Sequence, residues 1–228
     1  DLVVGEAYGA LYYFENVGNA TSPSYEAVTW HPFDGIDVGL RSAPAFADLD
    51  GDGDVDLVVG ELDGTLLYFE NVGSATLPTF AAVTGTASPF DGIDVGSRSA
   101  PALGDLDGDG DLDLVVGECN SVLKYIENVG SPTSPGYVAV GRAATPFVIG
   151  GEPIDVRVCS SPVVADLDGD GDLDLVVGSV VVVEDATGES SCSLADAGSF
   201  VQADGASEQT ACDAGKYSGS GASECVDC

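Results

Sequence analysis

Asp48–Glu61, DLDGDGDVDLVVGE, places five aspartates at alternate positions directly before an apolar run. Counted from Asp48, the carboxylates stand at positions 1, 3, 5, 7 and 9, and Gly53 at position 6 lets the chain fold back. Oxygen ligands at these offsets suit Ca²⁺, a hard cation that takes about 6 to 8 oxygens. Two carboxylates about 4 Å apart repel by roughly 4 kcal/mol at an effective dielectric constant of 20, so several together could cancel a domain stability of about 5 to 15 kcal/mol. The stretch therefore predicts a structural calcium site, and a merely solvated acidic turn is the alternative.

The same stretch recurs twice along the chain. Ala43–Glu61 returns as Ala100–Glu118 and again as Ser161–Ser179. The last aspartate of each loop falls 57 and then 61 residues after the one before, at Asp56, Asp113 and Asp174. Asp1 precedes Asp56 by 55 residues and opens the matching run DLVVGE, so we expect the chain to begin directly after a further loop.

Between the loops, short apolar runs alternate with turn residues and show no helical periodicity. Each full unit reads as four short strands, and tandem units of this kind are typical of propeller blades. We predict an all-β fold of tandem four-stranded antiparallel blades in a partial β-propeller, followed by a small disulfide-rich module. The expected segments are blades at 1–42 (partial), 43–99, 100–160 and 161–185 (partial), a linker at 186–191 and a cysteine-rich segment at 192–228.

That blade count is incomplete, because a ring commonly holds four or more blades. We therefore expect either a fragment of a longer chain or strands supplied by another copy or partner.

An EF-hand shares the opening of the loop but is excluded. It requires a glutamate at position 12 and flanking helices. Position 12 is valine in all three loops, at Val59, Val116 and Val177.

Across residues 1–185 the sequence resembles the FG-GAP or VCBS repeat of integrin α chains and many secreted proteins. In that family the loop joins two strands of a blade and binds calcium through positions 1, 3, 5 and 9. The resemblance implies three sites, with side-chain ligands Asp48, Asp50, Asp52 and Asp56; Asp105, Asp107, Asp109 and Asp113; and Asp166, Asp168, Asp170 and Asp174. Position 7 would add a backbone carbonyl in each site, from Asp54, Asp111 and Asp172.

The resemblance is closer to the VCBS form. The segments SAPAFAD and SAPALGD keep only Ala-Pro of the Phe-Gly and Gly-Ala-Pro signature, and SSPVVAD keeps only Pro. Integrin-like ligand binding is therefore unsupported.

Charge and hydropathy exclude several partners. The formal net charge is −33, with 39 Asp and Glu against 6 Lys and Arg, so nucleic acid is not expected to bind. The longest nearly apolar stretch, Leu175–Val183, is too short for a membrane span, which needs about 20 residues. We expect no membrane insertion.

Catalysis is also not expected. The chain has one histidine and no recognisable nucleophile arrangement or phosphate loop, and its repeated, near-identical carboxylates lack the unequal environments of an acid–base pair. Trp30 and His31 suit a local turn contact better than a ligand site.

Six cysteines divide into two groups. Cys119 follows one blade's second strand and Cys159 precedes the next blade's first, so a disulfide between them is predicted, with two free buried thiols as the alternative. An even number of cysteines fits an oxidising compartment.

The remaining cysteines are Cys192, Cys212, Cys225 and Cys228. Their segment resembles the cysteine-rich ephrin-receptor-like modules of extracellular proteins, with its disulfide pairing open. Zinc at the CVDC stretch is the weaker alternative, because no histidine is nearby.

These features favour a secreted or cell-surface, calcium-stabilised, non-catalytic scaffold for adhesion, matrix or assembly. Its expected partners are other extracellular proteins or copies of itself, and Asn19 in the triplet NAT is a predicted glycosylation site. The alternatives are a carbohydrate-binding propeller, for which the aromatic residues near ENVG (Tyr12, Tyr13, Tyr68 and Tyr125) are the candidate contacts, and accessory repeats of a larger secreted enzyme.

Overall fold

The computed structural model describes residues 1–119, 122–142, 144–156 and 159–180, and the backbone of short strands beyond residue 182. The chain divides into two compact units, Asp1–Val180 and Val181–Cys228. Apart from one 3₁₀ turn, η1 (Gly85–Ala87), the regular structure of the described residues is entirely β, which confirms the predicted class. The described residues hold no helix of the length and hydropathy needed to cross a bilayer.

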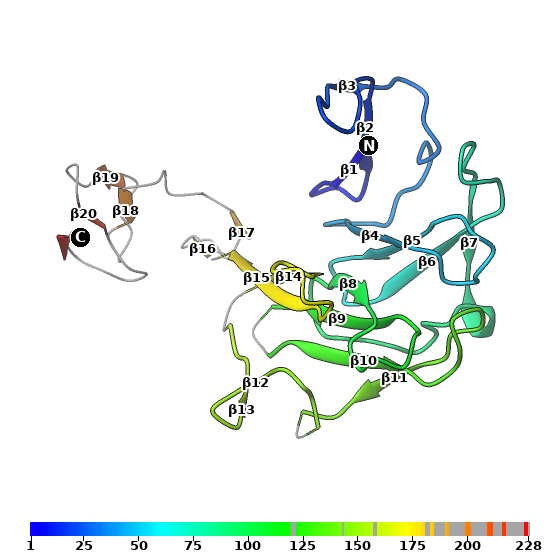
Figure 1. The fold of residues 1–228 in the computed structure, drawn as a ribbon. Helices are drawn as coiled ribbons and strands as arrows, with labels where there is room; N and C mark the ends of the chain where they lie inside the picture. The colour runs from blue at the N-terminus through cyan, green and yellow to red at the C-terminus, as the bar shows by residue number, and fades with distance from the viewer. Residues whose placement is uncertain are drawn as a thin grey trace. The chain divides into compact units, whose positions relative to one another are not determined.

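Two complete antiparallel sheets of four strands lie in the first unit (Figure 1). In both, the strands follow sequence order across the sheet. One comprises β4 (Ala43–Ala47), β5 (Asp56–Gly60), β6 (Leu66–Asn71) and β7 (Phe80–Val83). The other comprises β8 (Ala100–Gly104), β9 (Asp113–Gly117), β10 (Lys124–Asn128) and β11 (Tyr137–Val140). These sheets are the two complete blades.

Smaller sheets flank them on either side in the sequence. The first contains β1 (Leu2–Gly5), β2 (Leu11–Asn16) and β3 (Tyr25–Ala27). The last contains β14 (Cys159–Ala165) and β15 (Asp174–Val180). The second unit holds hairpins that pair β16 (Val183–Glu184) with β17 (Ser190–Ser191), β18 (Ser199–Val201) with β19 (Gln209–Ala211), and β20 (Lys216–Tyr217) with β21 (Val226–Asp227).

One hairpin is absent from the sequence prediction. β12 (Val148–Ile149) pairs with β13 (Glu152–Pro153) in the connection between β11 and β14. The preceding unit turns with only Asp91 and Gly92 between Phe90 and Ile93, whereas six residues separate Phe147 from Ile154. This insertion accounts for the change in loop spacing from 57 to 61 residues.

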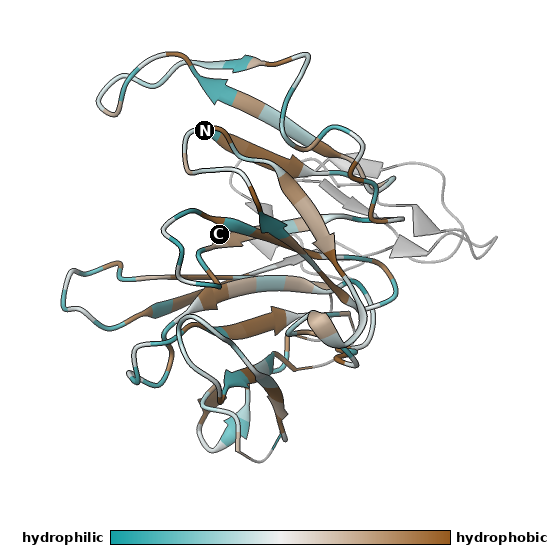
Figure 2. Cartoon of the chain, turned by 90° about the vertical axis from the view of Figure 1, so that its right-hand side faces the viewer, coloured by the Kyte–Doolittle hydropathy of each residue, from teal (hydrophilic) through white to brown (hydrophobic). Residues whose placement is uncertain are grey.

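The hydrophobic core lies between neighbouring sheets. Leu57, Val58 and Val59 of β5 are fully buried because the strand is covered on both faces. Alternate residues of the strand serve different clusters: Val58 packs toward the second complete blade, whereas Leu57 and Val59 pack toward the first sheet. Figure 2 shows hydrophobic residues concentrated along the strands and hydrophilic residues in the loops. This two-sided burial explains the uninterrupted apolar run after each aspartate loop.

A serine–glutamate contact joins each sheet to the next. The Ser99 amide donates to the Glu61 carbonyl at 3.0 Å, and the Glu61 amide donates to Ser99 Oγ at 2.8 Å. Ser42 makes the same two contacts with Glu6, and the Ser160 amide donates to the Glu118 carbonyl. A side chain at Gly60 would overlap the Ser99 carbonyl, so glycine permits this close approach.

β1 and the first strands of the three following sheets, β4, β8 and β14, line a cavity of about 470 Å³. Small residues of β4 and β8, including Ala45 and Ala102, form part of its wall together with Val163 of β14. Small side chains let these strands converge.

Candidate metal centre

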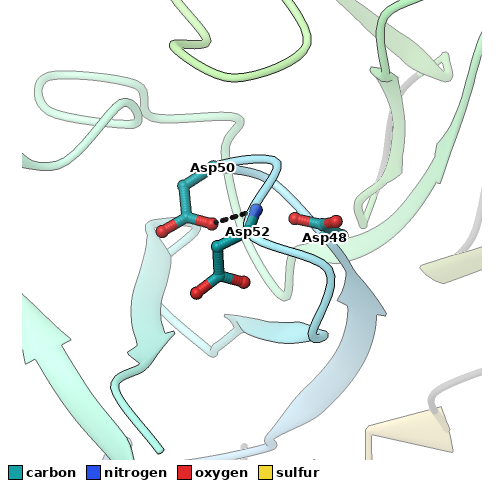
Figure 3. Close-up of side chains that lie close together, drawn as sticks. All are labelled: Asp48, Asp50 and Asp52. Carbon is teal, nitrogen blue, oxygen red and sulfur yellow. Dashed lines mark hydrogen bonds between the residues drawn. The ribbon is translucent and has the colours of Figure 1, made fainter. Parts of the chain in front are cut away.

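The loop between β4 and β5 is held closed by its own aspartates (Figure 3). Asp48 accepts hydrogen bonds from the amides of Gly51 at 2.7 Å and Gly53 at 3.1 Å. Asp50 accepts from the Asp52 amide at 3.2 Å. Gly51 and Gly53 have φ values of 76° and 94°, in the left-handed region that glycine adopts without strain.

The other two loops have the same geometry. Asp105 accepts from the amides of Gly108 and Gly110 at 2.8 and 3.1 Å. Asp166 accepts from Gly169 and Gly171 at 2.7 and 3.1 Å. The loop conformation is therefore encoded within the repeated sequence itself.

Three groups of carboxylates are compact enough to hold a metal ion. In each group, one oxygen from each residue lies within 4.8 Å of the others. The groups are Asp48, Asp50 and Asp52; Asp105, Asp107 and Asp109; and Asp166, Asp168 and Asp174. Positions 1 and 3 contribute in all three loops, and the third member is position 5 in two loops and position 9 in the last. Clustered carboxylate oxygens of this kind suit calcium or another hard cation.

Desolvation makes a counter-charge favourable at these loops. Oδ1 of Asp54 and Oδ1 of Asp111 are buried without a hydrogen-bond partner. Burial, with smaller contributions from the neighbouring aspartates, raises the pKa of both carboxyls. Burial also raises the pKa of Asp50 and Asp107, against the opposing effect of a backbone hydrogen bond. In the first two loops, negative charge is therefore concentrated where part of it is poorly solvated, whereas the carboxylates of the third group are all exposed. Together with the clustering of oxygens in all three loops, the residues present fit a divalent cation.

Position 9 connects the first complete loop to its blade. Asp56 Oδ2 accepts from the Leu49 amide at 3.1 Å and from the Tyr68 hydroxyl at 2.9 Å, and Oδ1 accepts from the Asn71 amide at 2.8 Å. Burial and the bond to Asp56 raise the pKa of the Tyr68 hydroxyl, which keeps it protonated as a donor. Asp56 therefore links the loop to β6.

The other copies repeat this arrangement. Asp113 accepts from the Tyr125 hydroxyl at 2.9 Å and the Asn128 amide at 2.8 Å. Asp1 accepts from the Tyr13 hydroxyl at 2.8 Å and from the amide of Asn16 at 2.9 Å. Asp1 thus occupies the position equivalent to Asp56, as the repeat spacing indicates.

Sequence reasoning missed the tyrosine and asparagine of this network. Their signal is the recurrence of a tyrosine three residues before the asparagine of ENVG, at Tyr13, Tyr68 and Tyr125. Tyr68 and Tyr125 are buried, whereas Tyr12 is exposed.

The structure describes some of the remaining predicted site residues and not others. Cys119 and Cys159 form the predicted disulfide. Asn19 lies in an exposed turn, where its Oδ1 accepts from the Thr21 amide at 3.0 Å. The predicted cysteines Cys192, Cys212, Cys225 and Cys228 lie outside the described residues. Metal ligation stays a prediction at every loop position; Asp170, the position-7 carbonyls, including that of Asp172, and Asp56 and Asp113 at position 9 lie outside the three compact groups.

His31 and Trp30 have different surroundings. His31 Nε2 lies 3.4 Å from Asp34 Oδ1, and its ring neighbours those of Tyr13 and Phe33. Trp30 is 85% exposed.

Comparison with protein families adds an independent observation. A family described as "FG-GAP-like repeat" matches residues 1–59 and 48–116, so the two overlapping matches together cover 116 of 228 residues. The match does not reach the cysteine-rich segment, whose resemblance to ephrin-receptor-like modules stays a prediction. The search of curated proteins found no match.

Proposed function

The chain belongs to the FG-GAP-like repeat family, and from this premise we propose that it is a non-catalytic extracellular scaffold whose blades are stiffened by calcium. The observation that carries the proposal is the threefold recurrence of a carboxylate cluster on one loop geometry. Asp48, Asp50 and Asp52 would hold one ion, Asp105, Asp107 and Asp109 a second, and the aspartates of 166–174 a third. A bound divalent cation would supply the positive charge that these loops lack.

Loop closure is coupled to the core through two residues. Leu49, at position 2, is only 2% exposed and packs with Val58 and Leu66. Asp56 binds the Leu49 amide as well as the Tyr68 hydroxyl. Repulsion that opened the loop would therefore withdraw Leu49 from the core and weaken the link to β6. Neutralising the loop stabilises the packing between blades.

An extracellular location is supported by two features of the chain. The Cys119–Cys159 disulfide joins β14 to the segment after β9, and such bonds persist in oxidising compartments. The exposed Asn19 turn is open to a glycosylating enzyme. Adhesion, matrix attachment or assembly with other extracellular proteins or with copies of itself are the roles that suit a rigid repeat scaffold.

The alternative functions have less support. Two of the recurring tyrosines that could have stacked on a sugar are buried and hydrogen-bonded to position 9. The other alternative is that the chain forms the accessory repeats of a larger secreted enzyme. Its blades would then be stiffened by calcium in the same way.

Thermal unfolding with and without calcium tests the proposal. Saturating a site at about 100 times its dissociation constant stabilises the native state by about 2.7 kcal/mol. We expect the Tm of the full chain to rise in millimolar CaCl₂ and to fall in EDTA, with a smaller response to MgCl₂. An identical Tm in CaCl₂ and EDTA would overturn the proposal.

A further inference from the structure

A second cluster of charged side chains lies on the second complete blade. Lys124 begins β10 opposite Val116, whereas the aspartate loop adjoins the other end of β9 at Asp113. Lys124 and Arg142 both line a cavity of about 390 Å³, together with Asp94 and Thr145. This volume lies within the range of about 300 to 1,000 Å³ typical of small-molecule sites.

Both cations depart from the pattern of the preceding blade. Leu67 faces Val59 in the register that places Lys124 opposite Val116, so Leu67 and Lys124 are equivalent. Leu67 packs against the core beside Phe33 and Val38. Arg142 follows Val140 at the spacing by which Gly85 follows Val83. This blade therefore places a lysine where packing alone accepts a leucine.

The two cations at this cavity have no ion-pair partner within the described part of the chain. The whole sequence has 6 Lys and Arg against 39 Asp and Glu, so carboxylate partners are abundant. Yet in the described part of the chain neither Lys124 nor Arg142 forms an ion pair within 4.0 Å. Asp94 contributes one carboxylate to the lining, and it already accepts a hydrogen bond from the Gly96 amide at 2.9 Å.

The rest of the described lining is largely apolar. Val95, Val122 and Ile126 border it but are buried in the core, whereas Ala139 and Val140 of β11 keep accessible surface. A ligand for this cavity would therefore combine negative charge with an apolar body. An arginine guanidinium binds a carboxylate in a bidentate manner, and a lysine ammonium adds a second charge-assisted bond.

We propose that this cavity is a binding site for a small organic carboxylate, held at its charged end by Lys124 and Arg142 and at its apolar body by Ala139 and Val140 of β11. The site is independent of the calcium loops, so it stands or falls separately from the scaffold function.

Amide chemical shifts of the full chain in calcium-containing buffer test the proposal, with sodium benzoate as probe and benzamide as its uncharged counterpart. We expect benzoate to cause saturable shifts at 94–95, 122–126 and 139–142. Because charge-assisted hydrogen bonds contribute about 1.5 to 3 kcal/mol, benzoate should bind at least about tenfold more tightly than benzamide.

Two substitutions restore the residues of the preceding blade. Lys124→Leu and Arg142→Gly should each weaken benzoate binding by about tenfold, given the loss of one charge-assisted bond. Arg41→Gln, which removes a cation at another position, should leave the affinity unchanged. The proposal would be overturned if benzoate and benzamide had equal dissociation constants. It would also be overturned if both variants kept the parent's affinity for benzoate while their spectra were otherwise preserved.

Discussion

Loops 48–56 and 166–174 share the sequence DLDGDGD and the same internal hydrogen bonds, but their surroundings differ. Leu49 is 2% exposed, whereas its counterpart Leu167 is 66% exposed. Asp56 is buried and accepts from Leu49, Tyr68 and Asn71, whereas the described hydrogen bond to Asp174 comes from Leu167 alone. Loop shape is therefore a local property, whereas the stability gained from the loop depends on the neighbouring strands.

The largest difference is expected at position 9. Asp56→Ala leaves buried donors without an acceptor, at about 1 to 3 kcal/mol each, so it should lower the free energy of unfolding by roughly 4 kcal/mol. Asp174→Ala should lower it by less than about 1 kcal/mol, because its site is exposed. Urea unfolding in EDTA measures both without a metal contribution. Equal losses would contradict the role assigned to the Asp56 network.

The disulfide fixes the sheet that carries loop 166–174, whereas the blade that carries loop 48–56 has no cysteine and so no such bond. Cys119 and Cys159 are separated by 40 residues, and closing a loop of that length stabilises by roughly 3 to 4 kcal/mol in the chain-entropy account. The double variant Cys119→Ser/Cys159→Ser should lose stability of this order in denaturant unfolding. Reducing the parent protein should reproduce the loss, and a parent insensitive to reductant would refute it.

Leu49 and Leu167, at position 2 of the two loops, allow the same test with apolar side chains. Leu49→Ala should cost about 2 to 5 kcal/mol because it leaves a cavity in a packed core. Leu167→Ala should change the stability by no more than about 0.5 kcal/mol, since the residue is exposed. The two variants can be compared by urea unfolding at saturating calcium. Similar losses would mean that loop 166–174 is as well packed as loop 48–56.

A smaller effect is expected where loop 48–56 meets the next blade. A methyl group added at Gly51 would overlap Cγ2 of Thr133, whereas one added at the equivalent Gly108 meets open space. Both glycines have a positive φ, so Gly51→Ala and Gly108→Ala carry the same backbone strain. Gly51→Ala should cost about 1 kcal/mol more, in line with overpacking, and Thr133→Ser should remove that excess. If Gly51→Ala remained more destabilising than Gly108→Ala after Thr133→Ser, the overlap with Thr133 would not be the cause.

Much of this architecture follows from the repeat. Recurrence of the aspartate loop and the apolar run identifies the strands and the carboxylate clusters, because loop geometry depends on residues close in sequence. The β12–β13 hairpin has no counterpart in residues 1–99, which the structure describes in full. The contacts of Asp56 with Tyr68 and Asn71 depend on the register of β5 against β6, and the Lys124–Arg142 cavity depends on the packing of two blades. Neither can be derived from local spacing.

The number of calcium ions bound per chain decides whether the aspartate loops are metal sites. Equilibrium dialysis of metal-free protein against CaCl₂ should show three saturable sites, one for each aspartate loop. Replacing Asp48, Asp50 and Asp52 together with asparagine should remove one site, whereas Asp63→Asn, outside the loops, should remove none. Absence of saturable calcium binding by the folded protein, or an unchanged number of sites in the triple variant, would contradict the account.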